Sequence, residues 1–163
     1  ILGPGSLYSS IIPNLLVDGV VAHIKESSAM KFYVCNVMTQ PGETAGYTAE
    51  EHLRQLMVHS APDIVDHIVL NEAATIDQIT AAQCETEGVE PVRYDRKVIE
   101  DMGVKVIAAP LLDPQAILHH DPRRLAHTIM ASIYKDKTYR ARRGRMKSFW
   151  DRKNLQAKWQ QEE

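Results

Sequence analysis

Polar side chains suited to binding chemistry gather in two glycine-containing segments of this sequence. The first, which we call the first loop, is Gly3-Pro4-Gly5-Ser6-Leu7-Tyr8-Ser9-Ser10. Its glycines let the backbone approach a ligand closely, and free N–H groups at the start of a following helix suit a phosphate. The spacing matches neither G-x-G-x-x-G nor G-x-x-x-x-G-K-[ST]. A phosphate-binding loop and a plain tight turn therefore both remain open from the spacing alone.

The second segment, which we call the second loop, spans residues 35–48 and reads CNVMTQPGETAGYT. It holds the amides of Asn36 and Gln40 together with several hydroxyl groups and one carboxylate, that of Glu43. An amide donates and accepts hydrogen bonds on one planar group, which is what recognition of a nucleobase or a sugar requires. A polar surface loop with ordinary turn chemistry is the alternative.

Other chemical signals are weaker. The His119-His120-Asp121 run is more typical of a helix cap than of a metal site, and the histidines lack H-E-x-x-H spacing. No serine lies in a G-x-S-x-G frame. Cys35 and Cys84 are predicted to be buried, reduced thiols. No catalytic residue and no metal ligand is assigned.

The elements that must position these loops alternate along the chain. Residues 31–38, 67–71 and 104–112 are predicted strands because they are short, apolar and rich in β-branched residues. Predicted helices begin after Tyr47, with a Thr48/Glu51 capping box, and at Asp121-Pro122; two more cover 75–87 and 96–102. This order predicts an α/β fold with a mostly parallel sheet and helices on both faces. Ligands bind at the carboxyl ends of such strands, where both loops lie.

Length and charge define two parts. The 163 residues, 44% apolar, are enough for one domain core, and no apolar run reaches the length of a membrane span. With no secretory signal pattern in residues 1–24, we expect a cytoplasmic protein. Residues 135–163 carry ten Lys/Arg against four Asp/Glu, while residues 1–134 carry nine against seventeen. We expect this tail to be a partly helical extension that is solvated or docks on a neighbouring subunit, with nucleic-acid binding the weaker alternative.

Two stretches, GPGSLYSSIIPNLLVDGV and YVCNVMTQPGETAGYTAEEH, closely resemble the YvcK branch of the CofD/YvcK family. The resemblance runs from residue 1 to about residue 134. It implies a Rossmann-like, three-layer α/β/α protein that binds a UDP-sugar, chiefly UDP-N-acetylglucosamine, and is linked to gluconeogenic growth, cell shape and cell-wall synthesis. Members of the CofD branch are instead transferases that build a deazaflavin coenzyme with magnesium, and Glu43 or an acid from elsewhere would then hold the metal.

The resemblance also assigns residues to the expected ligand site. The first loop would face the phosphates, and Asn36, Thr39 and Gln40 would recognise the nucleotide or sugar. The family often has an arginine where this chain has His119 and a tyrosine near Cys84, and these are the two departures of this sequence from the family pattern. The matching positions are Gly3, Gly5, Ser6 and Tyr8 in the first loop, and Asn36, Met38, Thr39, Gln40, Gly42, Glu43, Gly46 and Tyr47 in the second.

The family's N-terminal half carries a G-G-G-T-G-like loop that has no counterpart in these residues. We therefore expect residues 1–134 to be the C-terminal half of a nucleotide-binding domain, here a partial sheet. An exposed sheet edge favours association with the other half or with a second copy of the chain, as in a homo-oligomer.

Overall fold

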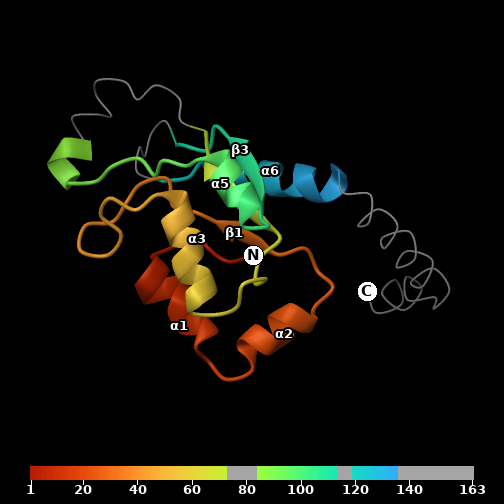
Figure 1. The fold of residues 1–163 in the computed structure, drawn as a ribbon. Coiled ribbons are helices and arrows are strands. Elements are labelled where there is room, and N and C mark those ends of the chain that lie inside the picture. The colour runs from red at the N-terminus through yellow and green to blue at the C-terminus, as the bar shows by residue number, and fades with distance from the viewer. Residues whose placement is uncertain (73–83, 114–118, 136–163) are drawn as a thin grey trace, which may run out of the picture. The chain divides into compact units, whose positions relative to one another are not determined.

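The structure, a computed structural model, describes residues 1–72, 84–113 and 119–135 (Figure 1). The chain divides into two compact units, residues 1–126 and 127–163. The elements are, in order, a π-helix η1 (Leu7–Ile11), α1 (Ile12–Leu15), α2 (Val20–Glu26), β1 (Phe32–Val34), α3 (Ala49–Val58), β2 (His67–Asn71), α5 (Arg96–Asp101), β3 (Lys105–Ala109) and α6 (Pro122–Lys135).

The strands form one parallel sheet in the order β1-β2-β3. Tyr33 pairs with Ile68, and Ile68 pairs with Val106. On the other side of β1, Leu2 forms a parallel bridge with Tyr33, with backbone hydrogen bonds of 2.8 Å to Phe32 and Val34. The first residues of the chain therefore lie beside β1, and the predicted α/β fold with a parallel sheet is confirmed.

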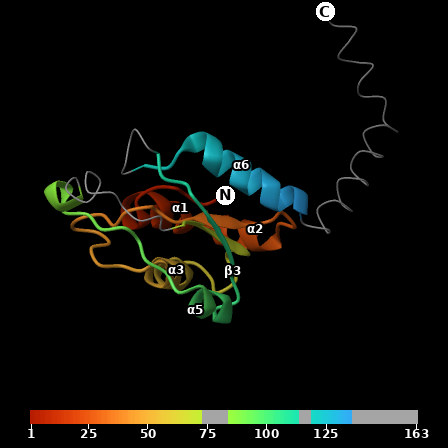
Figure 2. The same cartoon turned by 90° about the horizontal axis from the view of Figure 1, so that it is seen from above.

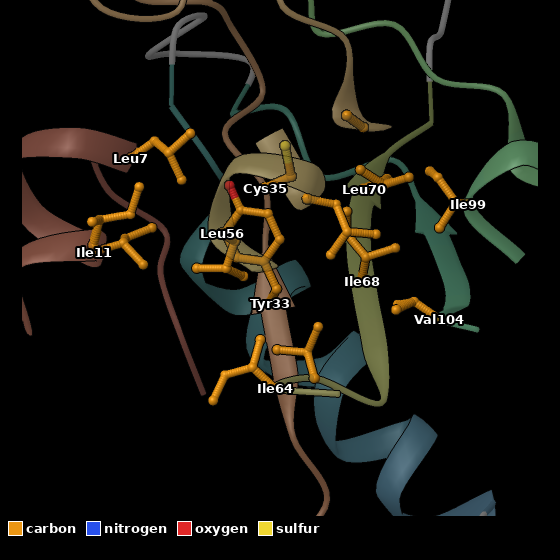
Figure 3. Close-up of a cluster of buried hydrophobic side chains, with 14 of the residues drawn as sticks. Leu7, Ile11, Tyr33, Cys35, Leu56, Ile64, Ile68, Leu70, Ile99 and Val104 are labelled. Carbon is orange, nitrogen blue, oxygen red and sulfur yellow. The ribbon is translucent and has the colours of Figure 1, made fainter. Parts of the chain in front are cut away.

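One face of the sheet packs against helices (Figure 3). Side chains two residues apart on a strand share a face, so Tyr33 and Cys35 of the β1 region join Ile68 and Leu70 of β2 in one buried cluster. Helical side chains complete the cluster: Leu7, Ile11, Leu53, Leu56 and Ile99. Seen from above, α3 and α5 lie on the same side of the sheet (Figure 2). Phe32, Val34 and Val69, which point to the other face, are buried as well, as expected for a parallel sheet.

Two predicted strands are longer than the observed ones. The prediction of a strand over 31–38 is wrong beyond Val34: Cys35 makes a last sheet hydrogen bond to Val69, and the chain then leaves the ladder. The strand predicted over 104–112 is regular only from Lys105 to Ala109, before Pro110, which has no N–H to donate. β1 therefore ends where the second loop begins.

The sequence predicted helix ends more exactly than strand ends. Thr48 and Glu51 form both hydrogen bonds of the predicted capping box of α3. Asp121 accepts hydrogen bonds from the first two free N–H groups of α6, as its predicted cap role requires. Of the helix predicted over 75–87, residues 75–83 lie outside the described residues, while residues 84–87 are helical and end at Gly88, whose φ is 65°. Helix α2 was not predicted.

Within the described ranges, no single helix is long and apolar enough to cross a membrane. The segments Leu7–Leu15 and Val20–Glu26 reach that length and hydropathy only when counted together across a 76° bend. Four apolar side chains of the first segment, Leu7, Ile11, Ile12 and Leu15, are buried in the core.

Candidate functional site

The first and second loops meet through a continuous chain of hydrogen bonds. The Gly5 N–H donates to Asn36 Oδ1 at 3.2 Å, and Asn36 Nδ2 donates to Gln40 Oε1 at 3.2 Å. Gln40 Nε2 in turn donates to Ser6 Oγ at 2.8 Å. Four residues predicted for the site, two from each loop, are thus brought together, although Gly5 and Asn36 lie 31 positions apart in the sequence and Ser6 and Gln40 lie 34 apart.

The sheet explains why the loops meet. Leu2 and Tyr33 are parallel neighbours, so the first loop and the second loop leave the same edge of the sheet. Gly3 allows this close approach because a Cβ there would lie 2.6 Å from the Val34 carbonyl oxygen, and because its φ is 81°. Gly3 therefore has a structural role, and it does not line the cavity described next.

A cavity of about 660 Å³ opens beside this hydrogen-bonded chain. That volume is within the usual range of small-molecule sites. Its lining combines polar groups of both loops with an apolar part: Pro4, Gly5, Ser6, Asn36, Val37, Met38, Thr39, Gln40, Pro41, Val89, His119, His120, Pro122 and Leu125. The cavity can therefore offer a ligand both hydrogen-bonding groups and apolar contacts.

The second loop is held in shape by its own polar groups. Thr39, which lines the cavity, is buried; its N–H donates to the Glu90 carbonyl, and its Oγ1 accepts from the Glu90 N–H at 2.9 Å. Thr44 Oγ1 accepts from the Gln40 N–H at 3.0 Å. Because Gln40 is fixed by Thr44 on its backbone and by two partners on its side chain, the polar wall of the cavity is preorganised.

Three further residues predicted to bind ligand do not line the cavity. Tyr8 and Tyr47 lie with their hydroxyl oxygens 3.1 Å apart, and Glu43 accepts a hydrogen bond from the Ser9 N–H at 3.1 Å. The Tyr47 ring also meets the His52 ring edge-on, with centroids 5.6 Å apart. Burial, together with the bond to Tyr47, raises the pKa of Tyr8 to about 12, so this phenol keeps its proton at neutral pH. These side chains join the two loops away from the cavity.

Comparison with known proteins agrees with this geometry. A family model described as 2-phospho-L-lactate transferase CofD matches residues 1–112, which contain both loops and the whole sheet. The chain belongs to the CofD family.

Relatives of this CofD-family chain include proteins named gluconeogenesis factor. The one from Halalkalibacterium halodurans is 41% identical over 131 residues, which are 80% of this chain and 40% of that protein. The one from Bacillus subtilis is 38% identical over 131 residues, 80% of this chain and 41% of that protein. A crystal structure of a UPF0052-family protein from Bacillus halodurans superposes with a TM-score of 0.75 at 42% identity, covering 79% of this chain and 41% of that one.

The CofD-family chain is thus a homologue of gluconeogenesis factors and spans about 40% of the length of these relatives. The family predicted from the two loops is confirmed. The tail after residue 135 lies outside the described residues.

Sequence reasoning missed the part of the cavity wall contributed by residues before and within α6. His120 lines the cavity and its Nε2 lies 3.2 Å from the Cys35 carbonyl oxygen, so this nitrogen carries the proton and donates. Burial lowers the pKa of His120 below 6.5, which keeps the ring neutral at pH 7. The sequence correctly predicted that Asp121 caps the start of α6 in this CofD-family chain. The spacing of residues did not show that the preceding histidines line the cavity beside the second loop.

Proposed function

We propose that this CofD-family chain forms the binding part of a cytoplasmic regulatory protein whose ligand is a nucleotide sugar of the UDP-N-acetylglucosamine type. The protein would couple the supply of that ligand to gluconeogenic growth, cell shape and cell-wall synthesis. The observation that carries the proposal is the cavity between the two loops, with the Gly5, Asn36, Gln40 and Ser6 chain along its wall.

The described lining carries no negative charge that would repel an anionic ligand. In the described part of the chain, none of the residues that line the cavity is acidic, and His119 and His120 are its titratable side chains. A diphosphate entering such a cavity meets hydroxyl and amide donors and no opposing carboxylate.

The two amides retain hydrogen-bonding capacity for the ligand. Asn36 and Gln40 each have two N–H donors, and the chain of bonds between the loops uses one N–H of each. Within residues 1–72, 84–113 and 119–135, the second N–H of each amide has no recorded partner, and it could donate to a carbonyl or hydroxyl oxygen of a nucleobase or sugar. Because the amides are already held in place, little side-chain entropy is lost when the ligand binds.

A binding role is better supported than a catalytic one. The described residues of the lining include no carboxylate, and the proton of His120 Nε2 is committed to the Cys35 carbonyl. The name gluconeogenesis factor carried by the relatives also describes a role in metabolism without naming a reaction.

Isothermal titration calorimetry of the intact protein tests the proposal, with UDP-N-acetylglucosamine, UDP and N-acetylglucosamine injected separately. Saturable heat with the nucleotide sugar, weaker heat with UDP and none with the free sugar is the expected order. Absence of heat with millimolar nucleotide sugar would refute the proposal.

A transferase of phosphorus-containing groups is the second candidate, and it is favoured by the description of the matching family model. Magnesium would serve such a reaction, but the residues described here do not fit a metal site: residues 1–72, 84–113 and 119–135 contain no group of three His, Cys, Asp or Glu side chains that could hold an ion. Glu43, considered for this role, is bound to the Ser9 N–H. Product formation from a deazaflavin acceptor and a nucleotide-activated donor would establish transfer, whereas lack of turnover would leave binding as the function.

Partners of the chain are part of the same proposal. We propose a homo-oligomer and an association with a further half of the nucleotide-binding domain, with nucleic acid the disfavoured partner. Light scattering on the eluted protein measures the oligomeric state, and a monomer across micromolar concentrations would contradict it. Nucleic-acid binding that weakens steeply with added salt would contradict the proposal about nucleic acid.

A further inference from the structure

Glu43 lies between the two loops without entering the cavity. Its Oε1 accepts a hydrogen bond from the Ser9 N–H at 3.1 Å, and its own N–H donates to the Gln40 carbonyl at 3.1 Å. It is absent from the cavity lining, whereas Gln40 is part of it. The residue thus connects a fixed point of the second loop to the first turn of η1.

The bond to Ser9 satisfies a donor that η1 itself leaves free. The N–H groups of Ser10 and Ile11 both donate to the Ser6 carbonyl at 3.0 Å, so Ser9 precedes the first N–H that bonds within the helix. With this bond, the segment from Gly5 to Ser9 is held by the second loop at three points: Asn36 holds Gly5, Gln40 holds Ser6, and Glu43 holds Ser9.

We propose that Glu43 is a positioning residue of the ligand site, whose carboxylate fixes the start of η1 so that Gly5 and Ser6 keep their places in the cavity wall. It does so without contacting the ligand. This inference rests on the proposed function of the cavity and adds a role that the motif alone does not reveal.

The second carboxylate oxygen of Glu43, Oε2, is consistent with a position outside the cavity. Glu43 Oε2 is buried and accepts no hydrogen bond from any described residue, and the same holds for Nε2 of the buried His52. His52 Nδ1 lies 2.8 Å from the Thr48 carbonyl and therefore carries the proton, which leaves Nε2 as an acceptor. Burial lowers the pKa of His52, and the Glu43 charge acts in the opposite direction. The carboxylate is therefore close enough to influence the pKa of His52, a core residue that does not line the cavity.

The test compares Glu43→Gln, which keeps an oxygen acceptor, with Glu43→Ala, which removes it. Glu26→Ala, at the exposed end of α2, is a control with the same change of charge as Glu43→Ala. Three quantities are measured in each protein: hydrogen exchange of the Ser9 amide without ligand, the pKa of His52 by NMR, and the affinity for UDP-N-acetylglucosamine.

We expect Glu43→Ala to speed Ser9 exchange and to weaken binding about tenfold, the effect of losing one charge-assisted hydrogen bond. Glu43→Gln should keep the Ser9 exchange rate and the binding affinity within roughly threefold of those of the parent protein, because a neutral acceptor remains. Both variants should lower the pKa of His52 because both remove the charge, and Glu26→Ala should change none of the three quantities.

A substitution on the donor side tests the same bond if Glu43→Ala fails to fold. Ser9→Pro removes the N–H that Glu43 binds, and proline has no backbone N–H to replace it. It should weaken binding as much as Glu43→Ala does, and adding Glu43→Gln to it should cause no further loss.

Equal losses of affinity in Glu43→Gln and Glu43→Ala, with Ser9 exchange unchanged, would overturn the inference and make Glu43 a ligand contact. Failure of the parent protein to bind UDP-N-acetylglucosamine would refute the proposed function instead. Ser9 exchange and the His52 pKa would still decide whether Glu43 holds η1.

Discussion

Replacing Asn36 by alanine removes the central member of the chain of hydrogen bonds between the loops. Asn36 Oδ1 no longer accepts from the Gly5 N–H, and Gln40 Oε1 loses the Asn36 donor. Gln40 keeps its own bond to Ser6, but its side chain is then fixed at one end only.

The size of the effect follows from the two bonds. Each is a neutral hydrogen bond in a partly buried place, and such a bond contributes about 0.5–1.5 kcal/mol, so the free energy of unfolding should fall by about 1–3 kcal/mol. Affinity for UDP-N-acetylglucosamine should fall by a similar free energy, roughly 5- to 150-fold, because Asn36 also lines the cavity.

Asn36→Asp separates the two effects. The new carboxylate still accepts from the Gly5 N–H, and the Gln40 amide can turn so that its NH2 faces that carboxylate while Ser6 donates to its carbonyl oxygen. Stability should therefore change less than in Asn36→Ala. The new charge repels a diphosphate, which at roughly 8 Å and an effective dielectric constant of about 20 costs about 2 kcal/mol of binding.

Urea unfolding measures the stability of the parent protein and both variants, and calorimetry measures their affinity. Asn36→Ala should lower both quantities, whereas Asn36→Asp should lower mainly the affinity. If Asn36→Asp binds the nucleotide sugar as tightly as the parent, the ligand's phosphates are not in this cavity and the reasoning is refuted.

Three further predictions concern the fold. Gly3→Ala should lower the free energy of unfolding by about 1–3 kcal/mol, because the new Cβ would meet the Val34 carbonyl at a positive φ; a melting temperature equal to the parent's would contradict it. Thr48→Ala should cost about 1 kcal/mol through the lost capping box, whereas Thr48→Ser should cost little in the same urea experiment. Burial lowers the pKa of both His52 and His120 below 6.5, so the unfolded chain binds more protons in acid; stability should fall as pH drops below about 6.5 and level off below the folded pKa values, and His52→Gln should reduce this slope.

Local sequence signals predicted the helix ends because a cap is made by neighbouring residues. Thr48 finds its partner Glu51 three residues away, and Asp121 bonds the next two free N–H groups of its own helix. Strand ends are different: β1 ends at Val34, and just beyond it Asn36 bonds Gly5, a residue 31 positions away. Apolar character continues to Met38, so the sequence alone favoured a longer strand.

The sequence indicated the polar residues of the candidate site but not which loop residues face the cavity. The types of Asn36, Gln40 and Ser6 indicated polar recognition, and the structure brings them to one cavity. Whether a loop residue faces the cavity or the opposite side depends on the turn from Gln40 to Tyr47, which residue types do not determine. The resemblance places Glu43 among the ligand residues, and the structure shows its carboxylate bonded to the Ser9 N–H.

The wall contributed by His119 and His120 could not be derived from spacing. His120 comes 85 positions after Cys35, and only the fold returns it to the second loop. The family motif indicates which loops form part of the candidate site. The rest of the cavity wall depends on how segments distant in the sequence pack together.

The most direct measurement is a calorimetric titration of the intact protein with UDP-N-acetylglucosamine, repeated on Asn36→Ala and on the Glu26→Ala control. The account predicts saturable binding by the parent protein and the control, and binding at least roughly fivefold weaker by Asn36→Ala. Undiminished binding by Asn36→Ala, or no binding by the parent protein, would contradict the assignment of the cavity between the two loops as a nucleotide-sugar site.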